Sequence, residues 1–121
     1  MEERRRFVRL NTLVKVEYAI IEKAGDGLGS TTKNISMGGI CLFLDKMIDK
    51  GTVLGLKIYI KEEVLPIQAR GRVVWIEKFD MGEGDKASHL EAGIEFSQIS
   101  DADRQRLSKY IFRSLAEIQG R

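Results

Sequence analysis

The sequence predicts a mainly β fold of the α+β class: a six-stranded antiparallel β-barrel with a C-terminal α-helix. Three observations favour this fold. Apolar and polar residues alternate through the middle of the chain, as they do in strands with one buried face. Turn signals rich in glycine and aspartate separate the alternating segments. The last segment instead carries its apolar residues at helical spacing.

The first predicted strand lies in residues 12–21, "TLVKVEYAII". Lys15 and Glu17 fall on its polar face. The opposite, apolar face holds Val14, Val16, Tyr18 and Ile20. Residues 53–60, "VLGLKIYI", repeat the pattern with Leu54, Leu56, Ile58 and Ile60. Both segments therefore predict strands that turn one face towards a core.

Two further strands are predicted later in the chain. Residues 67–77 follow Pro66, the only proline, and are rich in β-branched residues towards Trp75, which favours a strand. Residues 89–96 alternate again. Their polar face holds His89, Glu91, Gly93 and Glu95, and their apolar face holds Leu90, Ala92, Ile94 and Phe96. The turn signals lie at residues 23–30, 36–39, 49–51 and 80–88.

Residues 100–119 predict an amphipathic helix. The apolar residues at helical spacing are Leu107, Tyr110, Ile111, Leu115 and Ile118. Ser100 is suited to the N-cap position, with Asp103 three residues later as a reciprocal partner. Gly120 marks the end of the helix.

Six antiparallel strands avoid exposed edges most simply by closing into a small barrel, and the helix would cover an open end or side. We therefore expect a single domain over residues 1–121, with an N-terminal arm at 1–11, the barrel at 12–99 and the helix at 100–119. No segment suggests an attached output domain, so the sequence is read as a stand-alone protein.

Composition sets limits on function. A chain of 121 residues can bury a core without disulfides or metal, and its net charge of +2 is too small for a strongly basic nucleic-acid binder. The single cysteine, Cys41, agrees with a reducing compartment. No apolar run approaches the roughly 20 residues that span a bilayer, and the N-terminal cations are not followed by the apolar region expected of a signal peptide. These limits predict a soluble cytoplasmic domain without membrane insertion.

The positive charge is concentrated at the start of the chain. Four arginines stand within the first ten residues, at Arg4, Arg5, Arg6 and Arg9. Like charges repel, so this cluster needs an anion, and its small extent favours a small multivalent anion over a long polyanion. A solvated, disordered tail is the alternative interpretation.

A second motif lies in residues 33–43, "KNISMGGICLF". In an extended segment Asn34 and Ser36 project from the same face, while Gly38 and Gly39 permit a sharp turn and the close approach of a flat ligand. Amide and hydroxyl groups can bond a purine edge, and arginine bonds phosphate or guanine and stacks on bases. The same residues could instead only serve a hairpin turn.

Together the two motifs resemble the PilZ domain family of bacterial cyclic di-GMP receptors. Residues 5–9 match the pattern RxxxR, and residues 34–39 match [D/N]xSxxG, in the family's order. The segments "GRVVWIE" at 71–77 and "AGIEF" at 92–96 and the C-terminal helix also agree. The resemblance therefore covers almost the whole chain and combines two motifs, of which either alone would be weak.

The resemblance implies a six-stranded barrel whose N-terminal arm closes over cyclic di-GMP. In this family, an arginine directly before RxxxR is associated with the binding of a stacked pair of ligands. Arg4 occupies this position here, so two cyclic di-GMP per chain are expected. No other cofactor is implied. The ligand-binding residues that it implies are Arg4, Arg5, Arg6, Arg9, Asn34, Ser36, Gly38, Gly39 and Trp75. Trp75 could also pack purely as an apolar body.

The sequence does not favour an enzyme. His89 stands alone, and Cys41 lies in an apolar stretch without a neighbouring base, so no catalytic residue and no metal ligand is assigned. We therefore expect a receptor or adaptor whose arm changes conformation on binding and which signals to a downstream protein. The alternatives are a PilZ-like interaction scaffold that is independent of nucleotide and a single-stranded nucleic-acid binder. The latter would need more exposed aromatic residues and broader positive charge.

Overall fold

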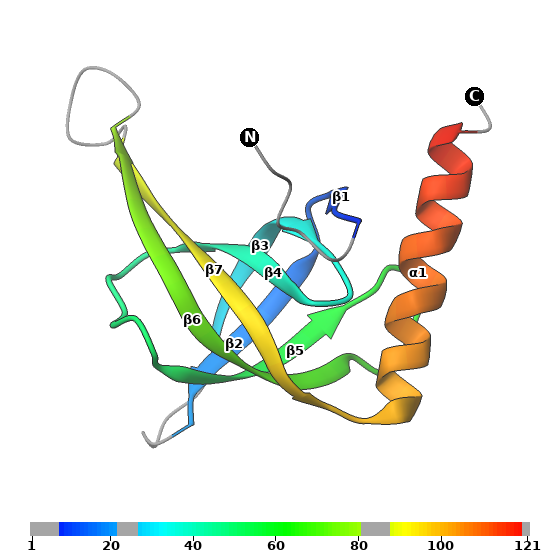
Figure 1. Ribbon diagram of the computed structural model, residues 1–121, viewed down its shortest axis with the longest axis horizontal. Helices are drawn as coiled ribbons and strands as arrows, with labels where there is room; N and C mark the ends of the chain where they lie inside the picture. The colour runs from blue at the N-terminus through cyan, green and yellow to red at the C-terminus, as the bar shows by residue number, and fades with distance from the viewer. Residues whose placement is uncertain (1–7, 22–26, 81–87, 120–121) are drawn as a thin grey trace.

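The computed structural model describes residues 8–21, 27–80 and 88–119 of the chain (Figure 1). These residues form seven β-strands and one α-helix. The strands are β1 (Leu10–Asn11), β2 (Lys15–Ile20), β3 (Leu28–Ile35), β4 (Gly39–Leu44), β5 (Val53–Tyr59), β6 (Ile67–Asp80) and β7 (Ser88–Ile99), and the helix is α1 (Asp101–Gln119). No helix among the described residues is long and apolar enough to cross a membrane.

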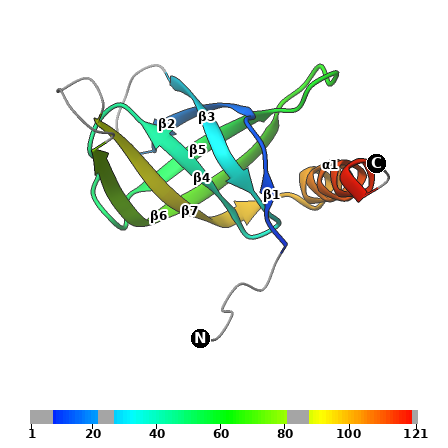
Figure 2. The ribbon, with the colours of Figure 1, turned by 90° about the horizontal axis from the view of Figure 1, so that it is seen from above.

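The strands close into a barrel. Their order is β1-β3-β2-β5-β6-β7-β4, every pairing is antiparallel, and an additional β3–β4 pairing joins the two sides of the sheet. Six strands therefore form a closed ring, and β1 is an extra short strand on β3. Figure 2 shows this ring with α1 standing beside it. The predicted six-stranded antiparallel barrel with a C-terminal helix is confirmed.

The barrel interior is filled by the apolar faces of the alternating strands. Its most deeply buried side chains include Val16, Ile35, Leu42, Leu54, Ile58, Ile67, Val73, Ala92 and Ile94. Because each fully buried aliphatic side chain contributes about 1.5–3 kcal/mol relative to an exposed one, this core fixes the register of every strand. The outward faces of the strands are thereby fixed as well.

The helix α1 packs on the outside of the barrel through Leu107 and Ile111, which are both buried. As predicted, Ser100 is the N-cap: its hydroxyl accepts a hydrogen bond from the backbone N–H of Asp103 at 3.1 Å. The predicted reciprocal role of the Asp103 side chain is wrong, because its carboxylate accepts instead from the Gln68 N–H at 3.2 Å and from Arg106 at 2.9 Å.

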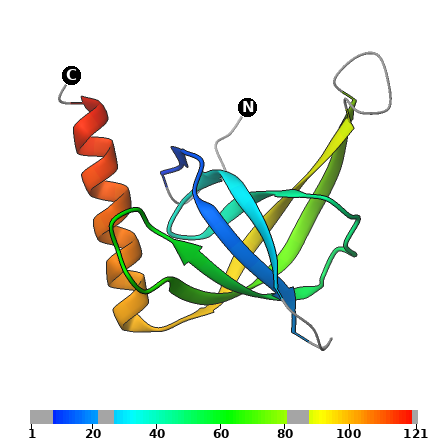
Figure 3. The same cartoon turned by 180° about the vertical axis from the view of Figure 1, so that it is seen from behind.

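Arg106 joins α1 to the turn between β5 and β6, which lies against the helix (Figure 3). Its guanidinium donates to the Glu63 carboxylate at 2.7 and 3.2 Å, to the Pro66 carbonyl at 3.3 Å and to the Leu65 carbonyl. The Glu63 hydrogen bonds raise the pKa of Arg106 above its usual value, and Asp103 adds to the effect. The helix is therefore attached at a polar contact as well as at its buried apolar face.

Two of the predicted turns differ from the observed elements or cannot be compared with them. The turn signal at residues 23–30 reaches too far, because β3 begins at Leu28 and pairs with β2 through Leu28, Gly29 and Ser30. A Cβ at Gly29 would meet nothing within 4 Å, so the packing there does not require glycine. The turn predicted at 80–88 falls largely on residues 81–87, which lie outside the described residues.

Candidate functional site

Four residues on neighbouring strands form one row across the outer surface of the barrel. Asn34 on β3 is paired with Cys41 on β4, Cys41 with Gly93 on β7, and Gly93 with Trp75 on β6. Directly paired residues project to the same side of a sheet. Their sequence neighbours Leu42 and Ala92 are buried in the barrel. The row therefore faces outward and brings Asn34 and Trp75, two of the predicted site residues, onto one surface.

The indole of Trp75 covers Gly93. A Cβ built at Gly93 would overlap the indole ring, so no larger residue fits under it. A β-bulge between Val73 and Trp75 shifts the register by one residue and turns Trp75 outward. Trp75 is half-buried in consequence, with one face of its ring against the sheet. The remaining exposed surface can stack on a flat ligand.

The turn of the second motif, residues 36–39, is held by its own hydrogen bonds. The Ser36 hydroxyl accepts from the Gly38 N–H at 3.1 Å and donates to the Gly39 carbonyl at 3.3 Å. The Ser36 N–H also donates to the Gly39 carbonyl, at 2.9 Å. Ser36 is 8% exposed. It therefore serves the turn, as one interpretation of the sequence anticipated, and one of its two lone pairs is left for a ligand.

The same turn is docked tightly onto β7. The Phe96 N–H donates to the Gly38 carbonyl at 2.9 Å. A Cβ at Gly39 would overlap the carbonyl oxygen of Ile94, so glycine is required for this close approach. Gly38 and Gly39 were expected to permit a turn and ligand access, and the packing against β7 is an additional reason for glycine at position 39.

The arginine motif can be placed only in part. Arg4, Arg5 and Arg6 lie outside the described residues, whereas Arg9 is exposed and directly precedes β1. In β1, Asn11 is paired with Asn34, so the end of the arm is fixed beside the row. Arg9 therefore stands one residue before the strand that pairs with β3 at Ile35 and Asn34.

A buried carboxylate lies next to this row, which the sequence analysis did not single out. Glu91 on β7 is 5% exposed. Lys33 donates to its carboxylate at 3.2 Å, and the His89 Nε2 lies 2.9 Å from its other oxygen. The alternation of residues 89–96 places His89 and Glu91 on one face, which is the signal in the sequence. Lys33, the other partner of Glu91, stands at a β-bulge between Thr32 and Asn34.

Burial, hydrogen bonds and charge shift the pKa values of Glu91 and Cys41. Burial raises the pKa of Glu91, but hydrogen bonds from His89 and Lys33 outweigh it and hold the pKa below its ordinary value. Burial, reinforced by the charge of Glu91, raises the pKa of the Cys41 thiol to about 11. A thiol with so high a pKa stays protonated near neutral pH and is a poor nucleophile, in agreement with the sequence analysis.

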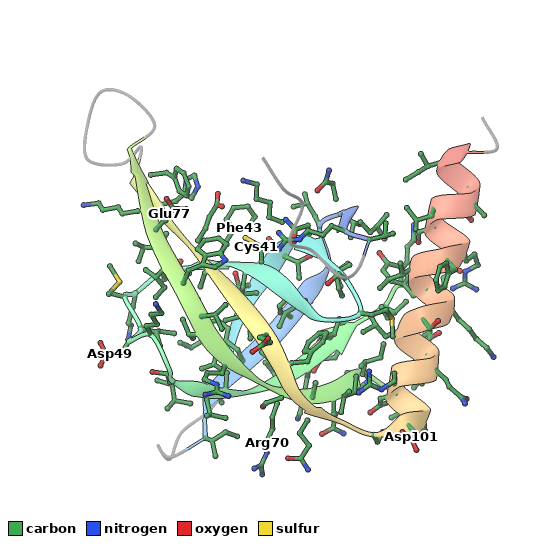
Figure 4. All side chains as sticks on the ribbon, in the orientation of Figure 1. Cys41, Phe43, Asp49, Arg70, Glu77 and Asp101 are labelled. Carbon is green, nitrogen blue, oxygen red and sulfur yellow. The ribbon has the colours of Figure 1, made fainter. Side chains whose placement is uncertain are left out.

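Aromatic rings extend this surface at the far end of β4, β6 and β7. His89 stacks on Phe79 with a centroid distance of 5.4 Å and meets Phe43 edge-on at 5.7 Å. Figure 4 labels Cys41 and Phe43 on β4 and Glu77 on β6 at this end. In the part of the chain that the structure describes, no group of three or more His, Cys, Asp or Glu residues could hold a metal ion.

A cleft of about 790 Å³ lies elsewhere on the barrel. Residues of β2, β5 and β6 line it, among them Glu17, Gly55 and Arg70. None of the predicted site residues borders it. The row at Asn34 and Trp75 lies outside this cleft, on the outer face of β3, β4, β7 and β6.

Comparison with solved structures shows the same fold in three bacterial proteins. The inhibitor of motility MotI/DgrA from Bacillus subtilis is 26% identical, with a TM-score of 0.74 over 96% of this chain and 53% of that chain. The PilZ domain of YcgR from Escherichia coli is 14% identical, with a TM-score of 0.75 over 98% and 96%. MrkH from K. pneumonia is 19% identical, with a TM-score of 0.78 over 98% and 53%.

The chain thus spans about half the length of MotI and MrkH and almost all of the isolated YcgR domain. No curated protein matches the chain. The sequence model of the PilZ domain matches residues 3–113, which include both motifs, the barrel and most of α1. The chain therefore belongs to the PilZ domain family.

Proposed function

We propose that this protein is a receptor for cyclic di-GMP that passes the signal to a downstream protein and has no catalytic activity of its own. The observation that carries the proposal is the position of β1. Its pairing with β3 fixes the end of the arginine motif beside Asn34, on the outer surface that also holds Trp75. A cationic arm beside a polar and aromatic surface suits an anionic ligand with flat bases.

Family membership supports this assignment. Solved structures with the same fold include the PilZ domain of YcgR with c-di-GMP and a MrkH–c-di-GMP complex. In the proposed site, Arg4, Arg5, Arg6 and Arg9 bind the phosphates and guanines. Asn34, Ser36, Gly38, Gly39 and Trp75 provide the barrel side. Binding brings the arm, residues 1–11, onto the barrel surface, and the changed surface is recognised in the cytoplasm by the downstream protein.

Binding is tested by calorimetric titration of the full chain with cyclic di-GMP. The fluorescence of Trp75, the only tryptophan, is a second readout, because stacking of a guanine on the indole should quench it. We expect saturable binding in both measurements. Absence of binding to the folded protein would contradict the receptor assignment and favour a nucleotide-independent interaction scaffold.

The arginine motif is tested with Arg9→Ala. A charge-assisted hydrogen bond contributes about 1.5–3 kcal/mol, so its loss should weaken the affinity about tenfold or more. The control is Arg113→Ala, which removes an exposed arginine from α1 and should bind like the parent. Equal affinities of Arg9→Ala and the parent would show that the ligand is held without this arginine.

A further inference from the structure

A second cleft lies beside the motif turn, between β7 and the start of α1. Figure 1 shows how β7 leads directly into α1. It has a volume of about 680 Å³. Met37 and Gly38 of the turn form one side, Glu95 and Phe96 of β7 line it, and Arg104 of α1 stands at another side. The cleft is therefore continuous with the candidate ligand site through Gly38, and it combines a carboxylate with a cation.

The backbone fixes Glu95 at the boundary between the row and this cleft. Glu95 is paired with Gly39 of the motif turn, and the adjacent Phe96 N–H bonds the Gly38 carbonyl at 2.9 Å. Glu95 follows Gly93 by two residues, so it lies on the same outer face as the row. Its side chain is exposed. Within the described ranges it forms no ion pair, although the exposed Arg72 is its direct partner on β6.

The chemistry of this position matches guanine. The Watson–Crick edge of guanine presents two adjacent donors, N1–H and the 2-amino group, and a carboxylate accepts both in parallel. Adenine offers an acceptor at N1 instead, which would face the carboxylate unfavourably. A guanidinium such as that of Arg104 binds phosphate. Together, the two side chains are complementary to the two ends of a guanylyl group.

We propose that Glu95 is a specificity-determining residue of the site. Its carboxylate accepts hydrogen bonds from the Watson–Crick edge of a guanine bound in this cleft, and Arg104 contacts a phosphate. This inference rests on the proposed function and adds to it the residue that rejects adenine. Asn34, with its amide, can bond either base, whereas a carboxylate accepts only. Glu95 therefore distinguishes the two dinucleotides more strongly than Asn34 does.

The test is a titration of the parent, Glu95→Gln and Arg104→Ala with cyclic di-GMP and with cyclic di-AMP. The amide of glutamine keeps the shape of Glu95 but replaces one acceptor by a donor. We expect Glu95→Gln to lose about tenfold or more in affinity for cyclic di-GMP and to bind cyclic di-AMP as well as or better than the parent. Arg104→Ala should weaken both dinucleotides by the same factor.

The matched control is Glu17→Gln, a half-buried glutamate on β2 that borders the other cleft, and it should behave like the parent. Thermal unfolding monitors the fold, and Glu95→Asp is a second variant with the charge retained on a shorter side chain. An unchanged ratio of the two affinities in Glu95→Gln, while the parent binds cyclic di-GMP, would overturn the role of Glu95 and leave the receptor assignment standing. Failure of the parent to bind would overturn both.

Discussion

Glu91 shows how a single buried charge is stabilised on the outside of a barrel. It projects outward from β7 and is nevertheless 5% exposed, because Lys33 and His89 cover it. A buried carboxylate is unfavourable unless its oxygens are hydrogen-bonded. Both oxygens have partners here. Glu91 therefore ties Lys33, the neighbour of Asn34 in the proposed site, to the first part of β7.

The lowered pKa of Glu91 predicts a pH-dependent stability. A carboxyl whose pKa is lower in the folded protein stabilises the fold above its ordinary pKa of 4.5, and the contribution disappears as the pH falls through the folded value. We expect Glu91→Gln to lower the free energy of unfolding by about 1–3 kcal/mol at pH 7. The loss should shrink steadily below pH 4.5.

Urea unfolding of the parent and Glu91→Gln, followed by circular dichroism from pH 7 down to the acid transition, measures this difference. Glu117→Gln on the exposed face of α1 is the control, and it should stay within about 0.5 kcal/mol of the parent. A gap between parent and Glu91→Gln that is the same at every pH would show that the ion pair is not its origin.

For single residues, the sequence predicts which side chains belong to the site better than it predicts their burial and hydrogen bonds. The outward position of Trp75 depends on the β-bulge before it, whereas the placement of Asn34 and Gly39 in one motif follows from motif spacing. The burial of Glu91 does not, because it depends on a bulge that brings Lys33 over a strand far away in the chain. The sequence is equally compatible with a Ser36 hydroxyl that bonds a ligand and with one that bonds its own turn. The hydrogen bonds to Gly38 and Gly39 show that it bonds the turn.

At the scale of elements, the attachment of α1 to the β5–β6 turn depends on Arg106. This side chain is about one third exposed and bonds Glu63, Asp103 and backbone carbonyls of the turn. We expect Arg106→Met, which keeps much of the apolar stem, to lower the free energy of unfolding by about 1–2 kcal/mol. Amide exchange should accelerate in α1 and in residues 60–66 more than in the barrel.

The matched control for this prediction is Arg113→Met, about two turns further along α1, where the arginine is exposed. It should change neither the stability nor the exchange rates by a measurable amount. If Arg106→Met left the exchange of α1 and of the turn as slow as in the parent, the apolar contacts of Leu107 and Ile111 alone would account for the attachment.

The elements themselves were largely predictable because their apolar residues repeat with a clear period. The alternation in residues 12–21, 53–60 and 89–96 and the helical spacing after Ser100 all correspond to observed elements. Two features had no such signal. The strand β1 has two residues, too few for a pattern, and β3 carries Gly29 and polar threonines, so that its first residues resembled a turn. Pairing with neighbouring strands, and not local preference, makes these segments extended.

At the scale of the whole molecule, barrel closure brings together residues that are distant in sequence. Asn34 and Trp75 share a row only because β4 and β7 lie between their strands. The net charge is +2, so attraction for an anion depends on where the cations are concentrated. The four arginines before β1 provide that concentration, and β1 fixes its end at the row.

This arrangement leads to the prediction of two cyclic di-GMP per chain. Two stacked ligands carry four phosphate charges within a few ångströms of one another, and their neutralisation requires several nearby cations. The arm supplies Arg4, Arg5, Arg6 and Arg9, which can also stack on the outer guanines. We expect calorimetry to saturate at two ligands for the parent and near one for Arg4→Leu, with a weaker dependence of affinity on salt in the variant.

The control for stoichiometry is Arg113→Leu, which removes the same charge from the exposed face of α1 and should still bind two. Loss of general electrostatic attraction would weaken both variants alike, whereas loss of a specific counter-charge changes the stoichiometry of Arg4→Leu alone. If the parent saturated at one ligand per chain, the cations of the arm would be serving a single dinucleotide. The surplus charge of Arg4 and Arg6 would then act on the rate of association and not on the number of ligands bound.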